Sequence, residues 1–222
     1  AHQYVLLNPH YKTTAEQDMK YYFLRMLSRI TSTRASKILA LSFRDMPGSK
    51  KKKIVTVPPL LRSEVFEIAP SDGDYIHGYM LNAGYFDEVS EWHEKHPEVP
   101  LRFFWDKKGA DEVTHVGDNF TLHKLNDEEF LRSMAGCKAY ATTSGFESLC
   151  EALYYSKPTL MVPVHVEQEF NAYDAGLSGV GISAKKFKLN KLIEFVPDYT
   201  PDSNFREWVH QAGERFIKEI CG

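Results

Sequence analysis

The sequence predicts an α/β protein built on a doubly wound parallel sheet, preceded by part of another domain. Between about Asp72 and Gly181, short apolar runs alternate with amphipathic helical patterns. Strands that alternate with helices at this interval are typical of βαβ units, whose strands are parallel. The chain has 222 residues, more than a usual single domain but fewer than two. One complete domain and a partial one are therefore expected.

The alternation is clearest in the middle of the chain. The expected strands are YIHGYML (75–81), LRFFW (101–105), NFTLHKL (119–125), KAYATT (138–143) and PTLMVPV (158–164). The expected helices are AGYFDEVSEWHEKHP (83–97), NDEEFLRSMAGC (126–137), GFESLCEALYYS (145–156) and the closing amphipathic stretch NFREWVHQAGERFIKEI (204–220). These segments have the length and apolar spacing of elements that pack on one sheet.

The first part of the chain follows another pattern. It opens with the strand-like apolar run YVLLNP and continues with a long helical pattern from about Thr13 to Thr33. Two strand candidates follow, KILALSF and IVTV, separated by a Pro-Gly turn and four lysines. Four consecutive lysines usually form a solvated turn, and a patch for an anionic membrane is the alternative.

Composition excludes several classes of protein. The net charge is −3, without the basic excess expected of a nucleic-acid binder, so no nucleic-acid partner is expected. The cysteines, Cys137, Cys150 and Cys221, lack CxxC spacing and suggest reduced thiols in a cytoplasmic protein. No apolar run approaches the roughly 18 residues that cross a bilayer. A soluble chain is expected, with the inner membrane face as an alternative location.

The stretch TTSGFESLCEALYYSKPTLMVP, from Thr142 to Pro163, combines a strand end with a helix start. Ser144 and Glu147 have the spacing of a capping box, in which each side chain bonds the backbone near the other. A helix that begins at the carboxyl end of a parallel strand also presents free N–H groups and a positive dipole end, which bind phosphate. Gly145 would let a ligand approach the backbone closely.

Glu151 stands apart on the same helix. The apolar side chains at core spacing leave Glu147 and Glu151 together on another face; they are Phe146, Leu149, Cys150 and Leu153. Glu151 lies about 10 Å along the axis from Ser144, roughly the span from a diphosphate to the ribose of a nucleotide. A carboxylate can accept hydrogen bonds from two ribose hydroxyls. The alternative is an ordinary capped helix with Glu151 on its surface.

The longer stretch TTSGFESLCEALYYSKPTLMVPVHVEQEFNA resembles the nucleotide-sugar signature of GT-B-fold glycosyltransferases. The resemblance is to the peptidoglycan N-acetylglucosaminyltransferase and UDP-glycosyltransferase group. It implies that Glu151 contacts the ribose, and that the donor sugar hydroxyls meet Glu167 and Gln168. It also implies a diphosphate site without a histidine, formed by Thr143, Ser144, Gly145 and Phe146.

The resemblance extends over most of the chain. It implies that the uracil edge is recognised by the loop of His123, Lys124 and Leu125, where Asn126 is also a helix N-cap. Asn82 to Gly84 occupy the place of the family's Gly-rich first loop. Arg62, in VPPLLRSEV, would lie near the phosphates and neutralise charge on the leaving nucleotide. The alternative for Arg62 is a surface ion pair with Glu64 or Glu67.

The resemblance also implies a division of the chain and a reaction. Residues 1–68 would be the tail of an acceptor-side N-terminal domain, and residues 69–222 a donor-binding domain with a crossing C-terminal helix. The reaction expected is inverting, metal-independent transfer of a sugar from a UDP-sugar, and no Asp-x-Asp pair is present to hold a metal. The catalytic base stays unknown, because the family's base lies on a loop expected outside these residues. Neither His2 nor the other histidines can be assigned to that role.

Two alternatives stay open beside the transferase. One is a non-catalytic nucleotide-sugar-binding subunit that needs a separate acceptor-domain partner. The other is a nucleotide-sugar epimerase of the same fold, which would need further carboxylates and a histidine around the sugar.

Overall fold

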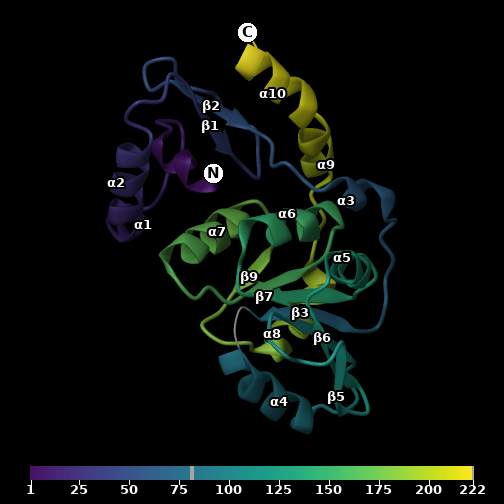
Figure 1. Cartoon of the computed structure of the whole chain (residues 1–222). Helices are drawn as coiled ribbons and strands as arrows, with labels where there is room; N and C mark the ends of the chain where they lie inside the picture. The colour runs from purple at the N-terminus through teal and green to yellow at the C-terminus, as the bar shows by residue number, and fades with distance from the viewer. Residues whose placement is uncertain (81–82, 222) are drawn as a thin grey trace.

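The chain folds around a small parallel sheet and a larger, mostly parallel one, which lie on either side of a layer of helices (Figure 1). The computed structural model describes residues 1–80 and 83–221. Within these residues, the smaller sheet has two strands and the larger has seven. The smaller sheet falls within residues 1–68 and the larger within residues 69–222, although the domain boundary itself stays a prediction.

The N-terminal segment, residues 1–68, surrounds the smaller sheet. Its elements are η1 (His2–Leu7), α1 (Ala15–Lys20), α2 (Tyr22–Thr31), β1 (Ile38–Leu41), β2 (Ile54–Val57) and α3 (Ser63–Glu67). The expectation of a strand-like opening is wrong, because the run forms the 3-10 helix η1. The predicted long helix is interrupted at Tyr21, whose ring is buried against Phe170. The two predicted strands are confirmed and pair in parallel.

The larger sheet has the strand order β5-β6-β4-β3-β7-β8-β9. The strands are β3 (Ile76–Met80), β4 (Leu101–Trp105), β5 (Val113–Gly117), β6 (Phe120–Lys124), β7 (Ala139–Thr142), β8 (Thr159–Met161) and β9 (Gly181–Ser183). Every predicted strand of this region is present. Two short edge strands were not predicted: β5, which runs antiparallel to β6, and β9.

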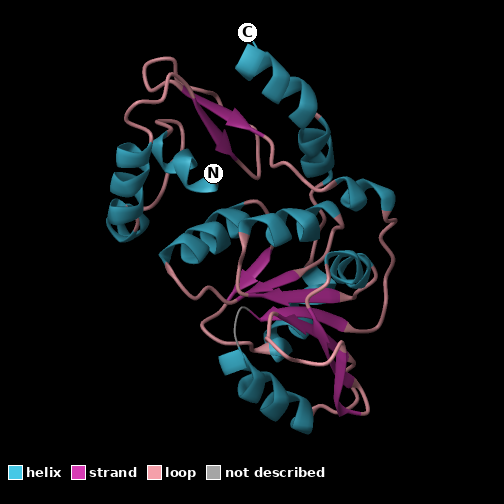
Figure 2. Ribbon diagram, in the orientation of Figure 1, coloured by secondary structure: helices cyan, strands magenta, loops and turns pink. Residues whose placement is uncertain are grey.

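Helices cover both faces of the larger sheet (Figure 2). They are α4 (Phe86–Lys95), α5 (Asp127–Ala135), α6 (Phe146–Tyr154), α7 (Val166–Leu177) and α8 (Leu189–Phe195). Apolar side chains of α4 and α8 pack on one face, whereas those of α5, α6 and α7 pack on the other. In β4, Phe103 faces the first layer and Phe104 the second, so the strand is buried on both sides. The fold is therefore doubly wound and Rossmann-like, as predicted.

The end of the chain returns to the N-terminal segment (Figure 1). After η3 (Val196–Asp198), the predicted closing helix is divided at Gln211 into α9 (Ser203–His210) and α10 (Ala212–Cys221). In α9, Trp208 donates a hydrogen bond of 2.9 Å to the carbonyl oxygen of Ser42. In α10, Glu219 forms an ion pair of 3.1 Å with Lys37. The C-terminal helices thus join the two sheets from one side.

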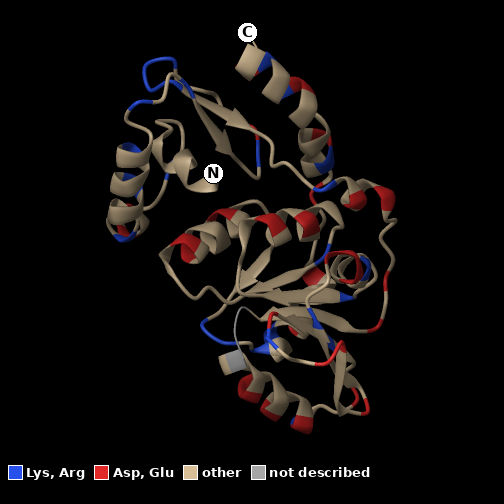
Figure 3. Ribbon diagram, in the orientation of Figure 1, with Lys and Arg blue, Asp and Glu red and all other residues tan. Residues whose placement is uncertain are grey.

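Charge is distributed unevenly over these elements (Figure 3). Lysine and arginine residues gather on α2 and on the exposed loop of residues 50–53. Acidic side chains line the helices around the larger sheet. Among the described residues, no helix has the length and apolar character needed to span a membrane. Association with a membrane surface stays a prediction.

Candidate functional site

The predicted phosphate loops emerge at the point where the order of the larger sheet reverses. From β3 the chain continues to β4 and β6 on one side, and then returns to β7 on the other side of β3. Tyr79 of β3 pairs with Thr142 of β7, so the loops that follow these strands leave the sheet next to each other. In open parallel sheets, ligands bind in the crevice at such a reversal, outside the carboxyl ends of the strands.

Ser144, between β7 and α6, has a backbone conformation that is rare outside glycine. Its φ angle is +70°, which costs a residue with a side chain about 1 kcal/mol or more. Two hydrogen bonds hold it there: its N–H donates to Thr142 Oγ1 at 3.3 Å, and its carbonyl oxygen accepts from Asn171 Nδ2 at 3.2 Å. Strained backbone of this kind is concentrated at functional sites.

The predicted capping box does not form. The N-cap of α6 is Gly145, and no side chain caps the helix. The positive φ of Ser144 places this residue before the cap, and Glu147 is exposed. The first N–H groups of α6 therefore lack the side-chain acceptor that the sequence suggested.

Buried polar atoms surround this helix start. Among the buried side-chain atoms of the described residues that have no hydrogen-bond partner are three oxygens at this helix start: Thr143 Oγ1, Ser144 Oγ and Asn171 Oδ1. Their residues are 1%, 0% and 4% exposed. A buried polar atom without a partner costs about 1 to 3 kcal/mol. Such a cluster at a helix N-terminus is arranged to receive a polar ligand.

Gly145 leaves space that the protein itself does not need. Its φ and ψ angles, −63° and 136°, are accessible to any residue. A Cβ atom at this position would lie 3.6 Å from Ser148 Oγ, an ordinary contact distance. Neither the backbone nor the packing therefore requires glycine, which fits close approach by a ligand.

Glu151 and Arg62 form an ion pair, which neither sequence alternative included. Glu151 Oε1 accepts a hydrogen bond from Arg62 Nε at 2.9 Å and lies 2.7 Å from Arg62 Nη2. Arg62 Nη1 also lies 3.4 Å from Asp127 Oδ1. The Glu151 side chain is 3% exposed, so the alternative of a surface glutamate is wrong. The alternative partners of Arg62, Glu64 and Glu67, are replaced by Glu151 and Asp127.

Burial and the ion pair act on Glu151 in opposite directions. Removal from water raises the pKa of the Glu151 carboxyl, while the positive charge of Arg62 lowers it, and the net effect is upward. Arg62 reaches Glu151 from the start of α3, and Asp127 is the first residue of α5. Arg62 and Glu151, which were both predicted to contact the ligand, thus contact each other between α3, α5 and α6.

Of the residues predicted to bind the base, His123 and Lys124 are the last two residues of β6, and Leu125 follows the strand. The ring of His123 stacks on Phe104 at 4.9 Å, and its Nε2 lies 2.9 Å from Thr121 Oγ1. The Lys124 side chain lies 3.8 Å from Glu112, and the Leu125 N–H donates to the carbonyl oxygen of Trp105. These contacts occupy both side chains and the Leu125 N–H. Asn126 caps α5 as predicted.

The predicted sugar contacts lie at the start of α7. Glu167 is exposed. Gln168 is 7% exposed, and its Oε1 accepts a hydrogen bond of 2.9 Å from the Val164 N–H. Gln168 therefore shapes the loop between β8 and α7, whereas Glu167 is open to a ligand.

The remaining predicted contacts surround β3 and the start of α6. Asn82 lies outside the described residues, and Gly84 belongs to the short 3-10 helix η2 (Ala83–Tyr85). The ring of Phe146 is occupied, because His2 stacks on it at 4.4 Å with an interplanar angle of 14°. Phe146 can therefore offer a ligand its backbone rather than its ring.

Sequence reasoning missed a buried polar cluster between the N-terminal segment and α7. Asp174 is fully buried; its Oδ1 lies 2.8 Å from Arg44 Nη2 and accepts a hydrogen bond from the Tyr11 hydroxyl at 3.0 Å. His2 Nε2 lies 3.3 Å from Asp174 Oδ2, close enough for an ion pair but without hydrogen-bond geometry. Burial lowers the pKa of His2. Because His2 is 4% exposed, the cluster attaches the segment to α7 and does not present an open base.

Asn171 was also missed as a site residue. It lies in the VEQEFNA stretch, and its distance from the Ser-Gly turn in sequence concealed the bond to Ser144. A surface hollow of about 780 Å³ lies in the N-terminal segment, between residues 6 and 54. None of the residues predicted to contact the donor lines this hollow, so it is distinct from the site at Ser144. Among the described residues, no group of His, Cys, Asp or Glu side chains is arranged to hold a metal ion.

Comparison with known structures supports the fold at low sequence identity. The kitacinnamycin glycotransferase has a TM-score of 0.61 and 14% identity, over 86% of this chain and 57% of that one. Arabidopsis thaliana UGT89C1 complexed with UDP-L-rhamnose has a TM-score of 0.57 and 15% identity, over 100% and 63%. LpCGTa in complex with UDP has a TM-score of 0.53 and 12% identity, over 89% and 54%.

These structures match the chain over little more than half of their own length. No curated protein matches the sequence significantly. Residues 2–199 match the family described as "Glycosyl transferase family 1". The match covers most of the chain, and the doubly wound sheet agrees with one half of the GT-B fold. The chain belongs to glycosyl transferase family 1.

Proposed function

We propose that this chain is the donor-binding half of a glycosyltransferase that uses a UDP-sugar. The diphosphate would lie at the N-terminus of α6, against the backbone of Gly145 and Phe146 and the hydroxyls of Thr143 and Ser144. The ribose would lie near Glu151 and the base near Leu125. Glu167 would contact the donor sugar.

The observation that carries this proposal is the helix start after β7. There, a strained Ser144 and buried oxygens without partners lie at the reversal of a parallel sheet. The N–H groups and dipole of α6 favour an anion at this point. Two of the similar structures hold UDP or UDP-L-rhamnose, which supports uridine as the base.

We further propose that transfer needs an acceptor-binding half, on this or another polypeptide. The chain matches only part of its structural relatives. One exposed face of α2 is apolar and carries Tyr22, Phe23, Met26, Leu27 and Ile30. A parallel sheet is normally covered on both faces and extended by further strands. The smaller sheet and α2 are therefore suited to receive more of an α/β domain.

The proposed reaction is displacement of the nucleotide at the anomeric carbon by an acceptor hydroxyl, with inversion. The α6 dipole and Arg62 would stabilise the negative charge of the departing diphosphate, so no metal is expected.

Titration calorimetry tests the donor site. The chain should bind UDP more tightly than GDP or TDP. Absence of binding by all three at millimolar concentration would refute a donor site, whereas preference for GDP or TDP would change only the base.

With a panel of UDP-sugars, the chain alone should give little transfer, because half of the cleft is lacking. Full turnover would place the catalytic base within these residues.

A further inference from the structure

The Arg62–Glu151 ion pair occupies the atom that a bound ribose would use. Glu151 Oε1 already accepts a hydrogen bond of 2.9 Å from Arg62 Nε and lies 2.7 Å from Arg62 Nη2 in the ion pair. In the proposed function, the same carboxylate accepts hydrogen bonds from ribose hydroxyls. A carboxylate has room for several donors, but a guanidinium bound in this way covers one side of it.

Arg62 is held less firmly than Glu151. Its side chain is 36% exposed, whereas that of Glu151 is 3% exposed. Its other acidic neighbour, Asp127, is 87% exposed and lies 3.4 Å away. Arg62 is the N-cap of the five-residue helix α3, next to the chain that crosses between the two sheets. An arginine on a long stem, at a short surface helix, can change partners at little cost in packing.

The charges favour such a change when a nucleoside diphosphate binds. Ribose hydroxyls are neutral, so a ribose without phosphates cannot displace the guanidinium from a buried carboxylate. A diphosphate carries more negative charge than one carboxylate, and its oxygens are good bidentate partners for arginine. Most charged residues on the helices around the larger sheet are acidic (Figure 3), so a diphosphate there needs a cation.

We propose that Arg62 and Glu151 exchange partners when donor binds: Arg62 leaves Glu151 for the diphosphate, and Glu151 then accepts the ribose hydroxyls. Arg62 thereby holds the ribose position closed against ligands that lack phosphates. The proposal rests on the proposed donor site. It assigns to Arg62 two opposite effects, exclusion of the nucleoside and attraction of the nucleotide.

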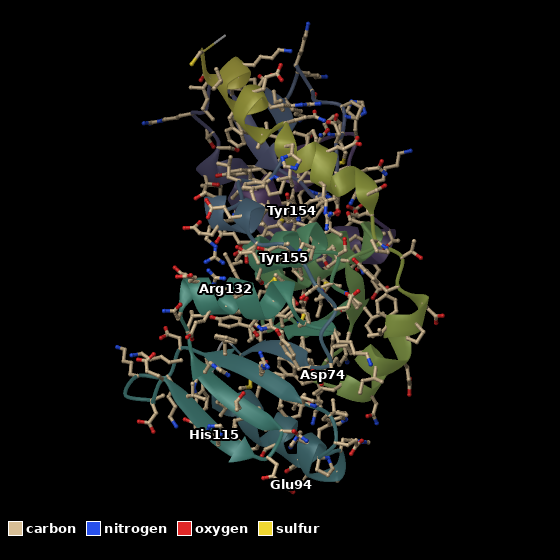
Figure 4. All side chains as sticks on the ribbon, turned by 90° about the vertical axis from the view of Figure 1, so that its right-hand side faces the viewer. Asp74, Glu94, His115, Arg132, Tyr154 and Tyr155 are labelled. Carbon is tan, nitrogen blue, oxygen red and sulfur yellow. The ribbon has the colours of Figure 1, made fainter. Side chains whose placement is uncertain are left out.

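The opposite effects give a test with two probes, uridine and UDP, titrated at pH 8 into the full chain and its Arg62→Gln variant. The substitution should weaken UDP binding at least tenfold, because the diphosphate loses its cation. It should tighten uridine binding about threefold or more, because the ribose no longer competes with the guanidinium. Arg132→Gln is the control: Arg132 lies on α5 (Figure 4), in an exposed ion pair with Glu128, and should change neither affinity.

Each other outcome is decisive. Equal weakening of UDP and uridine would mean that Arg62 only positions Glu151, and unchanged or weaker uridine binding would overturn the exchange. If the wild-type chain binds UDP but Arg62→Gln fails to fold, Arg62→Lys replaces it. Lysine keeps the charge but loses the two-donor contact, so uridine should still bind more tightly while UDP binding changes less. A wild-type chain that binds neither probe would refute the donor site itself, and with it the exchange.

Discussion

The side-chain amide of Asn171 donates a hydrogen bond of 3.2 Å to the backbone carbonyl oxygen of Ser144. This bond joins α7 to the loop that precedes α6, where Ser144 has a φ of +70°. The strained loop is thus held by a residue from the next βα unit. Its geometry is part of the fold before any ligand binds, as expected of a preorganised site.

The first prediction separates the backbone of Ser144 from its hydroxyl. Ser144→Gly should raise the free energy of unfolding by about 1 kcal/mol, because glycine tolerates a positive φ and an unpartnered hydroxyl is removed. Ser144→Ala keeps the strain and should be less stable than Ser144→Gly. Both variants should bind UDP about fivefold more weakly, since each loses one hydrogen bond of about 1 kcal/mol. Urea unfolding and calorimetry measure the two effects, and unchanged UDP affinity in both variants would exclude the hydroxyl from the site.

The second prediction concerns Gly145. Gly145→Ala should change the free energy of unfolding by less than about 1 kcal/mol, because the backbone and the neighbouring atoms accept a Cβ. If the diphosphate lies against this backbone, UDP affinity should fall at least tenfold. Gly213→Ala is the matched control, since a Cβ there meets nothing within 4 Å, and it should leave UDP affinity unchanged. A Gly145→Ala variant that binds UDP normally would place the diphosphate elsewhere.

The third prediction concerns Glu151. Glu151→Gln should cost about 1 to 3 kcal/mol of UDP affinity, because it weakens charge-assisted hydrogen bonds to the ribose. The loss should nearly disappear with 2′,3′-dideoxy-UDP, which makes the comparison a double-mutant cycle. Glu147→Gln is the control, because Glu147 is an exposed glutamate one turn earlier on α6. Equal losses with both ligands would show that Glu151 acts only through Arg62.

The ion pair changes one expectation for that variant. A surface glutamate would be replaced without effect on stability, but Glu151 is buried and bound to Arg62. Glutamine keeps an oxygen for the guanidinium while removing the charge. We therefore expect a modest loss of stability in urea unfolding, alongside the loss of UDP affinity.

Local patterns were sufficient for the central strands and their helices. β7 is buried throughout and β4 is buried except at Arg102, so both have mostly apolar sequences. Asn126 caps α5 as its side chain suggested. The antiparallel strand β5 was missed because none of its residues is buried: they alternate only between exposed and half-buried. A buried strand is evident from composition, whereas an edge strand depends on its partner β6.

The site was predicted less completely than the fold. The Ser-Gly turn at Ser144 follows from local sequence, but the Arg62–Glu151 pair joins residues 89 positions apart. The bond from Asn171 to Ser144 joins residues 27 positions apart. Pairings of this kind depend on how the helices pack, and no local spacing reports them. The positive φ of Ser144 was also unexpected, because a serine before a helix usually acts as its cap.

The last prediction concerns stability in acid and the buried histidine of β3. His77 is fully buried among Phe104, Phe130 and Tyr140, and its Nδ1 lies 3.0 Å from Ser133 Oγ. Burial, followed by the charges of His123 and Arg102, lowers the pKa of His77 from 6.5 to about 3. The unfolded chain therefore binds a proton at a pH where the folded chain does not. Stability should fall as the pH drops from 6.5 toward 3.

At pH 5.5, this single histidine should account for about 1.4 kcal/mol of lost unfolding free energy relative to pH 7.5 or above. His77→Phe keeps an aromatic ring in the same packing but cannot titrate, so its unfolding free energy should fall less between pH 7.5 and 5.5, by about that amount. Urea unfolding at the two pH values measures the difference. An equal slope for the wild type and His77→Phe would show that His77 accepts a proton within the fold, in spite of its burial.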